Sequence, residues 1–104
     1  MADPTDPVVA RLRAAIDGED RMILAALNRR IELVHELHRH KRESGYPLTD
    51  PGREARMLGE LRSANAGPLG DQCLQDLLQA LLTLTRVEVA RLLSGDDAAA
   101  AASR

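Results

Sequence analysis

The stretch AALNRRIELVHEL, residues Ala25 to Leu37, decides the fold because its apolar residues recur at helical spacing. The residues that share one side of the predicted helix are Ile23, Leu27, Val34 and Leu37. Arg30 falls on a position of this apolar stripe where a leucine would be expected. A charge in such a position is costly unless it meets an opposite charge. The stretch therefore predicts a packed helix and raises the question of which anion Arg30 meets.

Composition favours an all-α fold in one small domain. The chain has 104 residues with one tyrosine and no Phe or Trp, so leucine and other aliphatic residues must form the core. Residues that favour strands are few. The net charge of −2 gives no overall attraction to nucleic acid or to acidic membranes. The basic run from Arg39 to Arg42 contains no interleaved aromatic residue and is interpreted as a helix end that favours cations.

Several other classes of protein are disfavoured. Cys73 is the single cysteine, which fits a reduced, cytoplasmic setting. We expect no secretory signal, and no apolar run approaches the ~18 residues of a membrane span. The run HELHRH, from His35 to His40, lacks the histidine spacing of a zinc protease and has no evident third ligand. We therefore expect no metal and no cofactor.

Start and stop signals predict three helices. Asp6 followed by Pro7 is a cap and a first helical residue, and Gly and Pro end the helical period after Ser44. This first helix has about 36 residues, or ~54 Å at 1.5 Å per residue. The second helix is predicted from the cap Asp50 and Pro51 to about Ala64, and the third from Asp71 to Leu93 with Gly95 ending it. The predicted domain is 7–94, between an N-terminal tail 1–6 and a disordered tail 95–104.

The first helix is too long for the two shorter helices to cover. An antiparallel pair of copies would cover it, and two-fold dimers are the commonest oligomers. Lys41 returns to nearly the same face as Arg30, ~16 Å further along the axis. Arg13 lies ~25 Å before Arg30, so it would approach the Arg30 of the other copy in such a dimer.

The second helix also places polar residues beside apolar ones. Glu54 shares a stripe with Leu58 and Leu61, and Arg53 lies one turn before Met57. Taken singly, Arg30 could be a snorkelling side chain or part of an internal ion pair, and Glu54 an acid that suits the helix dipole. Taken together, several cations and carboxylates on inward faces indicate an anionic ligand that carries hydroxyl groups.

These residues resemble a known family. The chain is similar to the all-helical (AroQ-type) chorismate mutases over about residues 8–93, and the polar positions keep their spacing without a gap from Arg13 to Glu54. The matching motifs are LRAAID with Arg13, Asp20, LNRRIEL with Arg30, Lys41, and LTDPGRE with Asp50, Arg53 and Glu54.

The resemblance implies an intertwined, antiparallel homodimer of three-helix chains and the Claisen rearrangement of chorismate to prephenate, which feeds phenylalanine and tyrosine synthesis. It implies that Arg30 and Arg13 of the partner subunit bind the substrate carboxylates and that Lys41 reaches the ether oxygen and a carboxylate. It further implies that the ring hydroxyl is held by Asp50 and Glu54 and that Arg53 shapes the same wall. The opposite charge that Arg30 meets is then on the substrate.

The third helix departs from the family pattern. The family places a hydroxyl residue there and, four residues later, a Gln or Glu that contacts the ether oxygen. Matching the apolar faces puts Thr85 and Val89 at these positions, whereas a shift by one residue would put Leu84 and Glu88 there. Because valine cannot donate a hydrogen bond, activation by a partner enzyme of the shikimate pathway stays an open alternative. Such activation is implied by a resemblance to small actinobacterial members.

Two other functions remain as alternatives. One is a related enzyme of the same fold, an isochorismate pyruvate lyase or an aminodeoxychorismate mutase, although Asp50 and Glu54 together favour a substrate with the 4-hydroxyl. The other is a non-catalytic helical dimerisation module in which the buried charges only fix the register of the helices.

Overall fold

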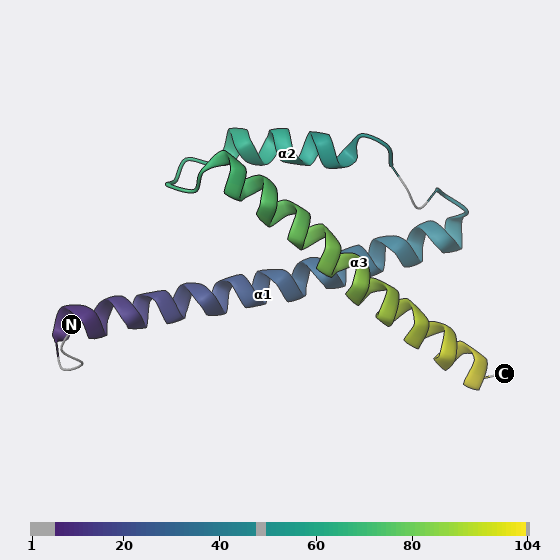
Figure 1. Ribbon diagram of the computed structural model, residues 1–104. Coiled ribbons are helices and arrows are strands. Elements are labelled where there is room, and N and C mark those ends of the chain that lie inside the picture. Colours follow the sequence, from purple (N-terminus) through teal and green to yellow (C-terminus); the bar gives the residue numbers. More distant parts are fainter. Residues whose placement is uncertain (1–5, 48–49, 104) are drawn as a thin grey trace.

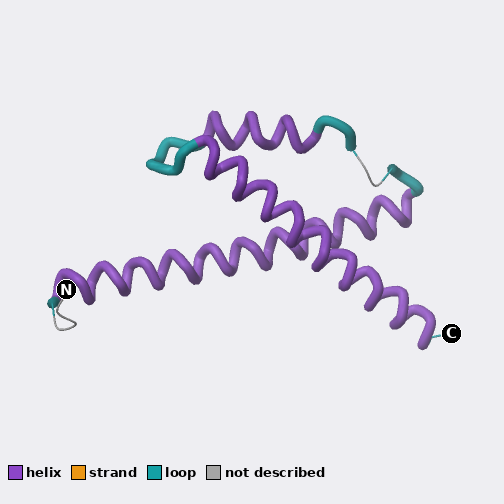
Figure 2. The backbone as a smooth tube through the Cα atoms, in the orientation of Figure 1, coloured by secondary structure: helices purple, strands orange, loops and turns teal. Residues whose placement is uncertain are grey.

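The computed structural model describes residues 6–47 and 50–103, and these residues form three helices joined by two loops (Figure 1). The helices are α1 (Pro7–Ser44), α2 (Arg53–Ala64) and α3 (Asp71–Ala102). The described part of the chain contains no strand (Figure 2), which confirms the prediction of an all-α fold with a long first helix. None of the described helices has a stretch long and apolar enough to cross a membrane.

Both ends of α1 lie where the sequence predicts them. The Asp6 carboxylate accepts a hydrogen bond from the backbone N–H of Val8 at 2.8 Å, and Pro7 is the first helical residue. The helix ends at Gly45, whose φ of 74° is in the left-handed region that glycine adopts without a steric penalty. The backbone N–H of Tyr46 donates to the Lys41 carbonyl at 2.9 Å, which completes the end of the helix.

The second helix begins later than predicted. Pro51 and Gly52 form a turn, and α2 starts at Arg53 because Gly52 has a φ of 85°, which is incompatible with a helix. Asp50 is therefore not the N-cap. Its carboxylate instead accepts a hydrogen bond from Arg56 Nη2 at 3.0 Å, and the first turn of α2 has no side-chain cap at all.

The third helix continues beyond the predicted end at Leu93, so the expectation of a disordered tail from residue 95 is wrong as far as Ala102. Alanine has the highest helix propensity, which favours a helical extension. Two acids of the extension also contact α1, since Asp96 Oδ2 lies 2.6 Å from His35 Nε2 and Asp97 Oδ1 accepts from Arg42 Nη2 at 3.2 Å. These contacts tie the end of α3 to the C-terminal half of α1.

The three helices pack through α3. In Figure 1 the helix α3 starts near the end of α2, runs back beneath it and then crosses the C-terminal half of α1. The buried side chains of the described residues all belong to α3, namely Leu74, Leu78, Thr85 and Val89, whereas α1 and α2 have none. The small core therefore lies along one face of α3, where it meets α1 and α2 in turn.

The N-terminal half of α1 extends away from the other helices (Figure 1) and carries uncovered apolar residues. Val8, Leu12, Ile16 and Ile23 are about half exposed. The chain exposes 8209 Å², whereas a compact monomer of its 11.3 kDa would expose about 5,700 Å². Its radius of gyration is 19.0 Å, against about 13 Å for a compact domain of this length. One chain alone thus leaves a large apolar face without a covering element.

Candidate active site

A cleft of about 550 Å³ lies where α1, the start of α2 and α3 come together. This volume is in the range of small-molecule sites. Its charged lining consists of four cations and two carboxylates, and the remaining lining is apolar or neutral. The lining residues are Arg30, Val34, Leu37, His38 and Lys41 of α1, Asp50, Pro51 and Gly52 of the loop, Arg53, Glu54 and Met57 of α2, and Leu82, Thr85 and Arg86 of α3.

Arg30 projects from α1 toward α3 and is half-buried. Its Nη1 donates to the Thr85 hydroxyl at 2.6 Å, and that hydroxyl donates in turn to the Leu81 carbonyl at 2.6 Å. Burial, and secondly the positive charge of Arg53, lower the pKa of Arg30 below the usual value of a guanidinium. No carboxylate of the described residues forms an ion pair with Arg30. The described part of the chain does not supply the opposite charge that this position needs.

His38 and Lys41 follow Arg30 along the same side of α1 and also line the cleft. Burial lowers the pKa of His38, and the nearby charges of Lys41 and His35 lower it further. His38 is therefore neutral at pH 7, because even its ordinary pKa of about 6.5 lies below that pH. The positive charge on this wall comes from Lys41 and Arg30.

The two carboxylates of the cleft come from the loop and from the first turn of α2. Asp50 pairs with Arg56 at 3.0 Å, and Glu54 pairs with Arg86 of α3 at 3.6 Å. All four side chains are about half exposed or more. Exposed ion pairs of this kind contribute about 0–1 kcal/mol, so each carboxylate can turn toward a ligand at small cost.

The residues of the two predicted registers on α3 differ in burial and in their contacts. Thr85 is buried at 4% exposure, contacts Arg30 and lines the cleft. Val89 lies one turn further on the same face and is buried at 2% exposure, outside the lining of the cleft. Glu88 points elsewhere and pairs with Arg91 at 2.8 Å. Hence Val89 and Glu88, both expected near the ligand, do not line the cleft of the single chain, and neither offers a donor there.

Two further arginines differ in how well the sequence predicts their position relative to the cleft. Arg13 is exposed on the N-terminal half of α1 and is not part of the cleft, as its ~25 Å separation from Arg30 predicts. Arg86 lines the cleft, although nothing in its local sequence distinguishes it from other exposed arginines. Its position follows from the way α3 packs against α2, which the sequence pattern does not specify.

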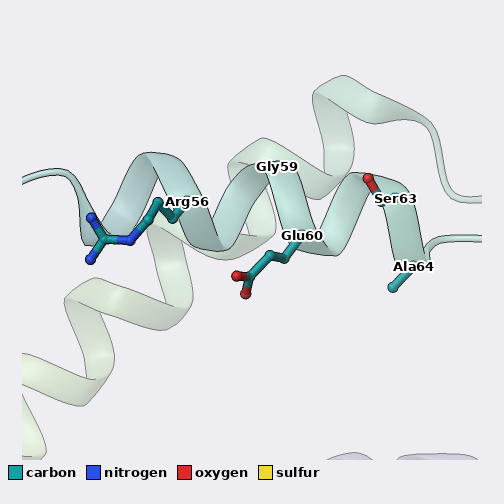
Figure 3. A pocket seen from close by; sticks show the side chains of 5 residues that line it. All are labelled: Arg56, Gly59, Glu60, Ser63 and Ala64. Atoms are coloured by element: carbon teal, nitrogen blue, oxygen red, sulfur yellow. The ribbon is translucent and has the colours of Figure 1, made fainter.

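A second hollow runs along α2 and is formed by Arg56, Gly59, Glu60, Ser63 and Ala64 (Figure 3). All five residues belong to this one helix, so no second element closes the hollow within the described part of the chain. Its opposite charges, Arg56 and Glu60, are both exposed. This surface lacks the convergence of charges from three elements that the cleft has.

Comparisons with known proteins identify a family to which this chain is similar. The model of the family described as chorismate mutase type II matches residues 12–88. The structure titled chorismate mutase (form II) from Thermus thermophilus is 34% identical, with a TM-score of 0.72 over 80% of this chain and 94% of that chain. Form I from the same organism is 35% identical, with a TM-score of 0.69 over 74% of this chain and 96% of that chain. No curated protein sequence matches at a comparable level.

Proposed function

The chain belongs to the chorismate mutase type II family, and on that premise we propose that its cleft converts chorismate to prephenate. The observation that supports this assignment most strongly is Arg30, a half-buried cation that faces the cleft without a carboxylate partner among the described residues. A dianionic substrate supplies the missing opposite charge. The product feeds the synthesis of phenylalanine and tyrosine.

The residue types of the cleft suit this reaction. The rearrangement is unimolecular and needs no proton transfer, so the enzyme acts by holding the substrate in its compact diaxial form. It also stabilises the negative charge that grows on the ether oxygen as the C–O bond breaks, which preorganised donors do best. In our proposal Arg30 binds a carboxylate, and Lys41 reaches the ether oxygen and a carboxylate.

The opposite wall of the cleft holds the substrate's ring. Asp50 and Glu54 accept the hydrogen bond of the ring hydroxyl, and Arg53 shapes this wall beside them. The alternative of a non-catalytic dimerisation module is disfavoured because it gives no reason for carboxylates and cations from three elements to converge on one open cleft. The presence of both acids favours chorismate over substrates that lack the 4-hydroxyl.

An absorbance assay tests the function. The purified chain should deplete chorismate and form prephenate, while isochorismate should release no pyruvate. Arg30→Ala provides the matched inactive control, because it removes a half-buried cation of the cleft that has no acid partner among the described residues. Pyruvate release from isochorismate would favour the lyase, and no turnover of either substrate would favour a non-catalytic module. The assay repeated in a cell extract containing shikimate-pathway enzymes would reveal an activating partner.

We also propose that the active form is an antiparallel homodimer. The surface exposed in excess of a compact monomer is roughly 2,500 Å² per chain, which matches the area that large obligate dimers bury per subunit. The uncovered apolar residues lie on the N-terminal half of α1, the same half that carries Arg13. An antiparallel partner would cover this face and bring its own Arg13 toward the cleft. The exposed single thiol of Cys73 is compatible with a reducing cytoplasm, where we place the enzyme.

Sedimentation at micromolar concentration is expected to give twice the chain mass. Ile16→Asp together with Ile23→Asp should convert the protein to monomers and abolish activity, because two charges would enter the apolar interface. Val87→Asp is the matched control, since Val87 is equally exposed but lies on α3. A stable, active monomer of the unchanged chain would contradict both the dimer and the role of Arg13.

A further inference from the structure

One ion pair crosses from α2 to α3 at the edge of the cleft. Arg86 follows Thr85 on α3, lines the cleft, and places Nη1 3.6 Å from Oε1 of Glu54. Among the ion pairs of the described residues it is the one that joins these two helices. Glu54 belongs to the first turn of α2, which has no side-chain cap. The ion pair with Arg86 thus gives this uncapped turn a contact with α3.

We infer that Arg86 is a positioning residue that aims the Glu54 carboxylate at the hydroxyl group of the substrate. The inference rests on the proposed function of the cleft and adds a residue to it. A glutamate side chain with 60% exposure samples several rotamers, and ordering them costs free energy when the substrate binds. The ion pair with Arg86 of α3 restricts Glu54 to fewer rotamers in advance, so less of this cost remains when the substrate binds.

The arrangement of charges separates this role from direct binding of the substrate's carboxylates. Arg86 already has a carboxylate partner and is 62% exposed at the rim. Arg30 has none among the described residues and is half-buried between α1 and α3. The substrate dianion therefore finds its counter-charges at Arg30 and Lys41, while Arg86 acts on the opposite wall through Glu54.

A double-mutant cycle measured on chorismate tests the inference. Arg86→Gln should lower kcat/KM about two- to fivefold, the range expected for loss of an exposed charge pair, and should act mainly through KM. In a Glu54→Gln background the same substitution should have no effect, because the residue it positions has lost its charge. Arg86→Lys should restore most of the activity.

Arg91→Gln is the matched control, because Arg91 is an equally exposed arginine of α3 whose partner Glu88 faces away from the cleft. It should leave kcat/KM unchanged. If Arg86→Gln lowers kcat/KM by the same factor in the unchanged enzyme and in the Glu54→Gln variant, Arg86 binds the substrate directly. That result would overturn the inference. So would an equal loss on Arg91→Gln. Failure of the proposed function would be seen separately, as no turnover by the unchanged enzyme.

Discussion

Replacing Lys41 with alanine is expected to lower kcat at least a hundredfold. Negative charge develops on the ether oxygen in the transition state, and removing one preorganised donor from such a site typically costs about 10²–10³ in kcat. Val89 is buried beside the cleft without a donor and Glu88 pairs with Arg91, so neither shares the task with Lys41. The loss should therefore fall on kcat, the quantity that reports stabilisation of the transition state.

Arg42→Ala is the control for this measurement. Arg42 is the neighbouring cation of α1, but it is directed at Asp97 of α3 and does not line the cleft. Steady-state rates of this variant should stay near those of the unchanged enzyme. A decrease for Lys41→Ala that appears in KM alone would mean that Lys41 binds the substrate in its ground state and that another group serves the ether oxygen.

Arg13→Ala and Arg30→Ala chains are each expected to be nearly inactive, and to recover activity when mixed after unfolding and refolding. If each site combines Arg30 of one chain with Arg13 of the partner subunit, one site of every heterodimer has both arginines. The other site carries both substitutions. Random assembly makes about half of the dimers heterodimers, so about a quarter of the full activity should return.

A mixture of Arg30→Ala with Lys41→Ala chains is the matched control. Both residues lie on α1 in the same cleft, so every site of that heterodimer keeps one lesion and activity should stay low. Recovery in the control would point to a general effect of mixing. Absence of recovery with Arg13→Ala and Arg30→Ala would show that both arginines act within one chain, against the antiparallel dimer.

The features that the sequence by itself determined are local ones. The start of α1 follows from Asp6, whose carboxylate accepts hydrogen bonds from the backbone N–H groups of Val8 and Val9. Its end follows from Gly45, which adopts a positive φ. The shared face of Arg30 and Lys41 follows from helical periodicity alone, because residues about three turns apart return to the same side. Such interactions connect residues close along the chain, so their pattern can be read directly.

The features that only the tertiary structure decided join residues far apart in sequence. The hydrogen bond from Arg30 to Thr85 spans 55 residues, and it depends on where α3 crosses α1. The face of α3 that carries Val89 is buried in the same packing, and the packing of α2 on α3 brings Arg86 to Glu54. The helical extension to Ala102 likewise has contacts with His35 and Arg42 that begin only when α3 lies on α1. Helix propensity and capping fix each helix separately, whereas the packing of whole faces fixes which side chains meet.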